Sequence, residues 1–163
     1  AYKTALAVIG DKGLTPIKCD GLREMGGGIV EGKPFTEAFG ENPELAEIWD
    51  KHPQDFAPEG GEPMNDAYER IWSTIKEIAA DNCGKTVACA SHGGVIRCLL
   101  CRLLYGDISH LAEMGWSDNT AVTLLRFSGE EMPEVVFYND ASHLPPELIP
   151  KRSRLSSFIG NEK

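Results

Sequence analysis

Residues 85–105 constrain the fold more than any other stretch of the sequence. The apolar, β-branched run K-T-V-A-C-A at residues 85–90 predicts a buried strand of the parallel type. The polar turn S-H-G-G follows at residues 91–94, and residues 95–105 have the apolar content and length of a helix. Strand, tight turn and helix form the repeating unit of α/β domains, whose ligands bind beyond the carboxyl ends of the strands. We therefore expect a ligand at this turn.

The remaining elements alternate in the same way. Helices are predicted from apolar periodicity at residues 2–11, 43–51 and 63–82, and strands at residues 15–19, 120–127 and 135–138. The last two strands form a hairpin, and the glycine-rich residues 21–32 form a loop. The expected fold is α/β with three layers, a mostly parallel sheet carrying helices on both faces.

Composition narrows the class of function. A net charge of -9 argues against binding to nucleic acid or to a membrane surface, which needs a clustered basic face. The longest apolar runs are far shorter than the roughly 20 residues of a membrane helix. The first residues have no pattern of a secretory signal, so a cytoplasmic location is expected.

The five cysteines do not indicate a disulfide framework, because their number is odd and they are scattered through apolar stretches. We expect free, mostly buried thiols. Cys98 and Cys101 are spaced as C-x-x-C within the predicted helix, yet no second cysteine pair could complete a zinc site with them. They are predicted to be thiols on the core or flank of that helix, and neither a metal nor a cofactor is predicted for this chain.

The S-H-G-G turn has the chemistry of an anion site. His92 can donate to phosphate oxygens, and the glycines after it allow the backbone to turn sharply and approach a ligand. The N–H groups that open the following helix carry the positive end of its dipole, which favours a bound anion. The alternative interpretation is that His92 only caps the helix or satisfies a buried carbonyl group.

Glu24 is the second candidate. It follows the strand predicted at residues 15–19 and precedes the glycine run, so its carboxyl group could be partly shielded and act as a general acid. Spacing alone favours the alternative interpretation, a solvated loop glutamate.

Six short motifs, taken in order, resemble the histidine phosphatase family of the phosphoglycerate mutase superfamily. They are T-A at residues 4–5, L-R-E-x-x-x-G with a later E-G at residues 22–32, G-E with an arginine eight positions after the glutamate at residues 61–70, S-H-G-G-V-I-R at residues 91–97, D-N-T-A-V at residues 118–122 and N-D-x-x-H-L at residues 139–144. The resemblance implies a histidine phosphatase domain over residues 1–144, followed by a C-terminal extension at residues 145–163.

The resemblance also implies roles for individual residues. His92 becomes the second phosphate-binding histidine, and Gly93 contributes its backbone N–H. Glu24 becomes the proton donor to the leaving alkoxide and later the base toward water. Asn119 resembles a position at the edge of the site. The implied activity is hydrolysis of phosphomonoesters through a phosphohistidine, with a small phosphorylated metabolite as partner; sugar phosphates, phosphoglycerates and a nucleoside-type phosphate all fit.

One departure from the family is large. The family's nucleophilic histidine lies in an R-H-G turn after a first strand beside residues 85–90, and this sequence contains no R-H-G. We expect that first strand to belong to a missing N-terminal segment, a possible partner of this chain.

Three other functions were weighed by the same motifs: a phosphoglycerate mutase, a non-catalytic binding module and an α/β-hydrolase. A phosphoglycerate mutase is less favoured because its E-R-H-Y-G stretch is replaced by E-M-G-G-G at residues 24–28. A non-catalytic module that binds a phosphorylated ligand stays open. An α/β-hydrolase is excluded because Ser91 lacks the G-x-S-x-G context.

Overall fold

The structure, a computed structural model, describes residues 1–129 and 132–148. Its α-helices are α1 (Tyr2–Ile9), α2 (Phe35–Glu41), α3 (Pro43–Lys51), α4 (Met64–Asp81) and α5 (Gly93–Tyr105). Its 3-10 turns are η1 (Asp20–Leu22), η2 (Gly28–Val30), η3 (Pro53–Asp55) and η4 (Ile108–Ala112), and its strands are β1 (Val122–Arg126) and β2 (Glu134–Asp140).

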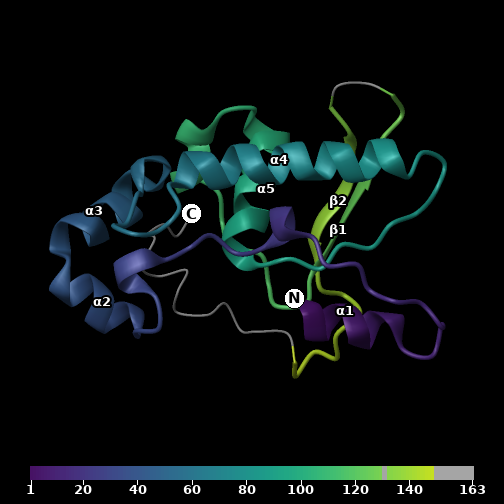
Figure 1. Cartoon of the computed structure of the whole chain (residues 1–163), viewed down its shortest axis with the longest axis horizontal. Coiled ribbons are helices and arrows are strands. Elements are labelled where there is room, and N and C mark those ends of the chain that lie inside the picture. Colours follow the sequence, from purple (N-terminus) through teal and green to yellow (C-terminus); the bar gives the residue numbers. More distant parts are fainter. Residues whose placement is uncertain (130–131, 149–163) are drawn as a thin grey trace.

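The core lies where α4 packs on α5. Apolar residues recur every three or four positions along α4, so they form one face that α5 covers. The buried contacts come from Tyr68 and Ile71 on α4 and from Val95, Cys98 and Leu100 on α5. Figure 1 shows α4 along the length of the molecule, with α2 and α3 at one end and the β1–β2 hairpin toward the other.

Most of the predicted helices are confirmed. Observed α1, α3 and α4 lie at the predicted positions, and α5 begins two residues earlier than expected, at Gly93. Helix α2 was not predicted, because residues 35–41 are few, contain Gly40 and follow Pro34, which is typical of a loop. Both Cys98 and Cys101 are fully buried, but Cys83 and Cys89 are exposed, so the prediction of mostly buried thiols was only partly right.

The sheet differs from the predicted one. Strands β1 and β2 pair antiparallel, with Val122 opposite Asp140 and Arg126 opposite Glu134, which confirms the terminal hairpin pair. Residues 15–19 and 85–90 lie outside every strand, so the strands predicted there are wrong for the described chain. Ile17 is 93% exposed and Val87 45% exposed. A strand needs a neighbour for its ladder hydrogen bonds, and neither segment has one here.

The three-layer, mostly parallel sheet is therefore not found among the described residues, where the only sheet has two antiparallel strands. Within residues 1–129 and 132–148, no helix combines the length and the apolar character needed to cross a bilayer. Of the expected C-terminal extension, residues 149–163 lie outside the described part of the chain.

Candidate active site

Glu24, a predicted site residue, hydrogen-bonds to the start of α5 directly after His92 and Gly93. The first N–H groups of a helix have no acceptor inside it. At α5, the Gly94 N–H donates to Glu24 Oε2 at 3.0 Å, and the Val95 N–H donates to Glu24 Oε1 at 3.2 Å. The N–H group of Gly93, the residue between His92 and Gly94, has no acceptor among the described residues. A carboxylate and one available donor therefore lie side by side at the positive end of a helix.

Gly94 allows this contact. The residue is buried, and a Cβ atom added to it would lie 2.8 Å from Glu24 Oε1. Such a separation is shorter than van der Waals contact, so any larger residue at position 94 would displace the carboxylate.

Three consecutive carbonyl groups just before Glu24 accept hydrogen bonds that hold this loop in place. The Arg70 Nη1 group donates to the carbonyl oxygens of Gly21 at 2.7 Å and of Arg23 at 3.1 Å. Ser91 Oγ donates to the carbonyl oxygen of Leu22 between them, at 2.8 Å. Helix α4 and the residue before His92 thus fix the loop from two sides.

Arg70 is itself fixed by Glu62. Its Nε and Nη2 groups donate to the two carboxylate oxygens of Glu62, each at 2.7 Å, in a bidentate pair. The hydrogen bonds from Arg70, followed by its charge, hold the pKa of Glu62 below its ordinary value. Both residues belong to a motif found in the sequence, but we predicted no role for either. The sequence signal that could have pointed to this ion pair was an arginine eight positions after a glutamate.

His92 is the N-cap residue of α5, with an extended backbone and a partly exposed side chain. Its carbonyl oxygen accepts the Ile96 N–H at 3.0 Å. His92 is thus not among the buried residues, and it stands one residue before the available Gly93 donor.

Asn119 is not hydrogen-bonded to Glu24, His92 or Gly93 in the described part of the chain. Its side chain is exposed on the turn before β1. Beside it, the Asp118 N–H donates to Asn139 Oδ1 at 2.7 Å, which ties that turn to β2.

Two further side chains near the turn were not predicted. Arg97 is 2% exposed on α5, and its guanidinium carbon lies 5.0 Å from the ring centroid of Trp116. The Trp116 indole in turn contacts Gly93. An arginine inside an apolar helical run was a usable signal for Arg97, whereas nothing in the local sequence pointed to Trp116.

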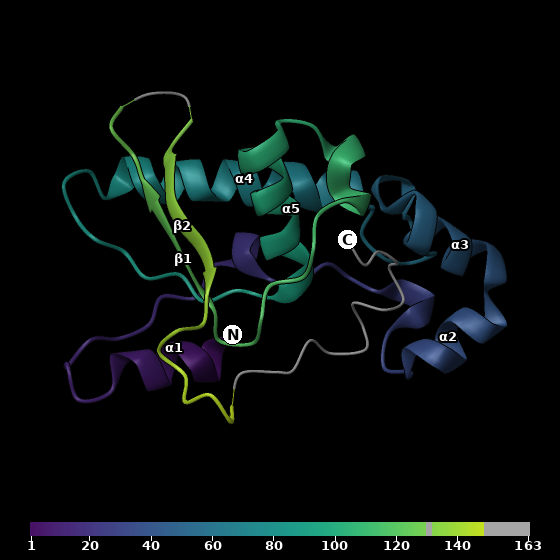
Figure 2. The same ribbon diagram turned by 180° about the vertical axis from the view of Figure 1, so that it is seen from behind.

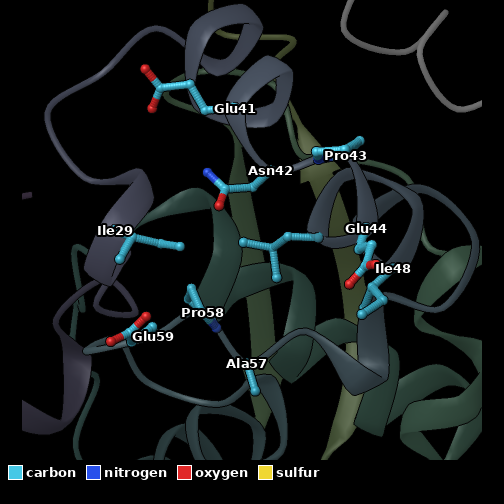
Figure 3. A pocket seen from close by; sticks show the side chains of 10 residues that line it. Ile29, Glu41, Asn42, Pro43, Glu44, Ile48, Ala57, Pro58 and Glu59 are labelled. Atoms are coloured by element: carbon cyan, nitrogen blue, oxygen red, sulfur yellow. The ribbon is translucent and has the colours of Figure 1, made fainter.

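Two cavities in the described part of the chain do not include the anion site. A cavity of about 390 Å³ lies between the α2–α3 junction and the loop at residues 57–59, where Figure 3 shows Ile29, Asn42 and Pro58 around it. A second, of about 250 Å³, borders Trp116 and Asn139. In the described part of the chain, no three His, Cys, Asp or Glu side chains lie close enough together to hold a metal ion.

Comparison with known proteins agrees with the family resemblance of the sequence motifs. The family model of the histidine phosphatase superfamily (branch 1) matches residues 1–141. Phosphoserine phosphatase 1 of Hydrogenobacter thermophilus is 29% identical over 144 residues, which are 88% of this chain and 67% of that protein. The chain therefore spans about two thirds of the length of this relative.

Solved structures share the fold. Bacillus stearothermophilus YhfR superposes with a TM-score of 0.81 and 27% identity, covering 88% of this chain and 70% of that one. A mycobacterial glucosyl-3-phosphoglycerate phosphatase in complex with inorganic phosphate gives a TM-score of 0.74 at 24% identity, covering 89% and 74% of the two chains. Since the family model spans nearly all the described residues, the chain belongs to branch 1 of the histidine phosphatase superfamily.

Proposed function

We propose that this chain supplies the phosphate-binding and proton-transfer residues of a phosphomonoester hydrolase. The observation that carries the proposal is the Glu24 carboxylate on the N–H groups of Gly94 and Val95, beside His92 and the available Gly93 N–H. An ester needs a proton donor for its leaving group within reach of the donors that hold its phosphoryl oxygens. The phosphatase names of the relatives support the same reaction.

Two donors of the site would bind the phosphoryl group. The Gly93 N–H points from the start of α5, where the helix dipole favours an anion. The His92 ring can donate a second hydrogen bond to a phosphoryl oxygen. Donors fixed in place before the reaction stabilise the charge that builds up in the transition state, because they need no reorganisation.

The hydrogen bonds of Glu24 distinguish its two oxygens. Oε1 accepts from the Met25 N–H at 3.1 Å and from the Val95 N–H, so both its lone pairs are used. Among the described residues, Oε2 accepts only from the Gly94 N–H and so keeps one lone pair. We assign the transferred proton to Oε2. It passes to the alkoxide as the ester P–O bond breaks, and Oε2 later takes a proton from the attacking water.

The nucleophile in this proposal is a histidine of an R-H-G turn outside these 163 residues. Its attack on phosphorus forms a phosphohistidine, and water then breaks the P–N bond and releases phosphate. The strand leading to that turn would pair beside residues 85–90 and cover exposed side chains such as Val87. Such pairing would complete the three-layer, mostly parallel sheet.

The proposal is tested by phosphate release from an aryl phosphate, using protein that includes the R-H-G segment. His92→Ala should lower turnover by a factor of about 10² or more, as loss of an oxyanion-type donor does. His110→Ala is the matched control, because His110 is paired with Glu113 at 2.9 Å on η4, and it should keep full turnover. Full turnover in His92→Ala would refute the assignment, and phosphate binding without any turnover would favour the binding module.

A further inference from the structure

We infer that Arg97 and Trp116 are positioning residues that hold the Gly93 N–H in the direction needed to bind a phosphoryl oxygen. This inference rests on the proposed function, because it concerns the same anion site. We propose no direct contact between either side chain and the substrate. Both act through the backbone of the turn between His92 and Gly94.

Trp116 lies against the turn itself. Its Cζ3 and Cε3 atoms lie 3.3 and 3.5 Å from the position that a Cβ atom on Gly93 would occupy. The indole therefore fills the space on one side of the α-carbon of Gly93 and blocks movement of the turn toward that side. The residue is still 36% exposed, so it borders solvent at the turn rather than the interior.

An aromatic ring of α3 packs against the Trp116 indole. The Trp49 ring of α3 stacks with it at a centroid distance of 6.0 Å and an angle of 29°. Trp49 in turn meets the buried Phe56 edge to face at 4.7 Å. The aromatic contacts thus connect Trp116 to the end of the molecule that contains α2 and α3.

Arg97 fastens the chain segment that carries Trp116. Its Nε group donates to the Met114 carbonyl at 2.8 Å and its Nη2 group to the Leu111 carbonyl at 2.6 Å. The guanidinium also lies over the Trp116 ring. Figure 2 shows the chain after α5 turning over and running back beside that helix to β1. Arg97 therefore ties this returning segment to the helix whose first amide is the proposed donor.

The burial of Arg97 argues for a specific role. Desolvation lowers the pKa of this guanidinium, and the carbonyl groups and indole ring compensate only part of the cost of burying a charge. An apolar side chain would pack in this position without that cost. A fork of donors, however, can fix two carbonyl groups and an aromatic ring at once, which places Trp116 beside Gly93.

The first test measures binding of inorganic phosphate by isothermal titration, again with parent protein and variants that include the R-H-G segment. Trp116→Ala should bind phosphate about tenfold more weakly than the parent protein, which corresponds to the loss of roughly one well-oriented hydrogen bond. Trp116→Phe should recover most of the affinity, because a smaller ring still contacts Gly93. Phe127→Ala is the matched control, since Phe127 is 37% exposed and follows β1. It should bind phosphate as the parent does.

The second test asks whether Arg97 acts through Trp116. Arg97→Met should weaken phosphate binding as much as Trp116→Ala, and the double variant should bind no more weakly than either, because both changes release the same amide. Arg97→Lys keeps the positive charge but not the forked set of N–H donors. Its phosphate affinity should therefore lie between those of the parent and of Arg97→Met. If Arg97→Met does not fold, Arg97→Lys and Trp116→Phe decide the comparison.

The outcomes distinguish a failure of the proposed function from a failure of the positioning role of Arg97 and Trp116. If the parent protein binds no phosphate, the proposed function fails. If the parent binds phosphate and Trp116→Ala binds it equally well, only this inference is refuted. A lowered melting temperature with unchanged phosphate affinity in the Arg97 variants would show a purely structural role and would also overturn it.

Discussion

Replacing Gly94 by alanine tests the contact between Glu24 and the start of α5. The added Cβ atom would lie 2.8 Å from Glu24 Oε1, so the carboxylate must withdraw from the N–H groups of Gly94 and Val95. Weakening two charge-assisted hydrogen bonds at a half-buried site costs about 2 kcal/mol of folding free energy. The higher helix propensity of alanine offsets at most about 1 kcal/mol of this loss. We expect Gly94→Ala to be less stable by about 1 kcal/mol.

Urea denaturation of a small set of variants would measure this effect. Gly40→Ala is the matched control, because Gly40 lies in α2 and no other group among the described residues comes within 4 Å of its added Cβ. This control should gain up to about 1 kcal/mol from helix propensity. In a Glu24→Ala background the clash is gone, so Gly94→Ala should then be neutral or stabilising. An equal loss of stability with and without the Glu24 carboxylate would refute the reasoning.

Three further predictions concern other parts of the molecule. Glu62→Gln should lower the free energy of unfolding by about 2 kcal/mol near neutral pH, because the bidentate bond with Arg70 loses its charge. Since the folded-state pKa of Glu62 lies below its ordinary value of 4.5, its stabilising contribution is present above that value and is lost as the pH falls through the folded pKa. The stability difference between parent and variant should therefore shrink in urea titrations as the pH is lowered below 4.5, and a constant difference would contradict the ion pair. Burial raises the pKa of the Cys98 thiol to about 12, so iodoacetamide should alkylate exposed Cys83 well before Cys98, as peptide mass spectrometry can measure. Equal labelling rates in the folded protein would show that Cys98 is accessible. Thr120 has a φ of 66°, where a β-branched side chain is strained, so Thr120→Asn should stabilise the protein by about 1 kcal/mol in thermal unfolding. An unchanged melting temperature would mean that this strain is small.

The helices were predictable because their signals are local. The apolar periodicity of α4, the proline that opens α3 and the glycine that follows α5 all act within one or two turns of the chain. The short α2 has no such periodic face and begins after a proline, so only its packing against α3 decided it.

The strands were harder because a strand depends on a partner. Residues 122–126 and 134–140 find each other across a short connection, and their hairpin was predicted correctly. The runs at residues 15–19 and 85–90 have the composition of strands, but composition cannot supply the neighbour that strand pairing needs.

The sequence by itself determined the S-H-G-G turn with the helix behind it and indicated His92 and Glu24 as candidates, and the family resemblance gave these two residues their roles. The tertiary structure decided that Glu24 reaches Gly94, a residue 70 positions away, and that Arg70 holds carbonyl groups 47 and 49 positions away. It also decided that Trp116 lies beside Gly93. A turn or a helix is set by neighbouring residues, whereas a hydrogen bond between distant segments exists only after packing has brought them together.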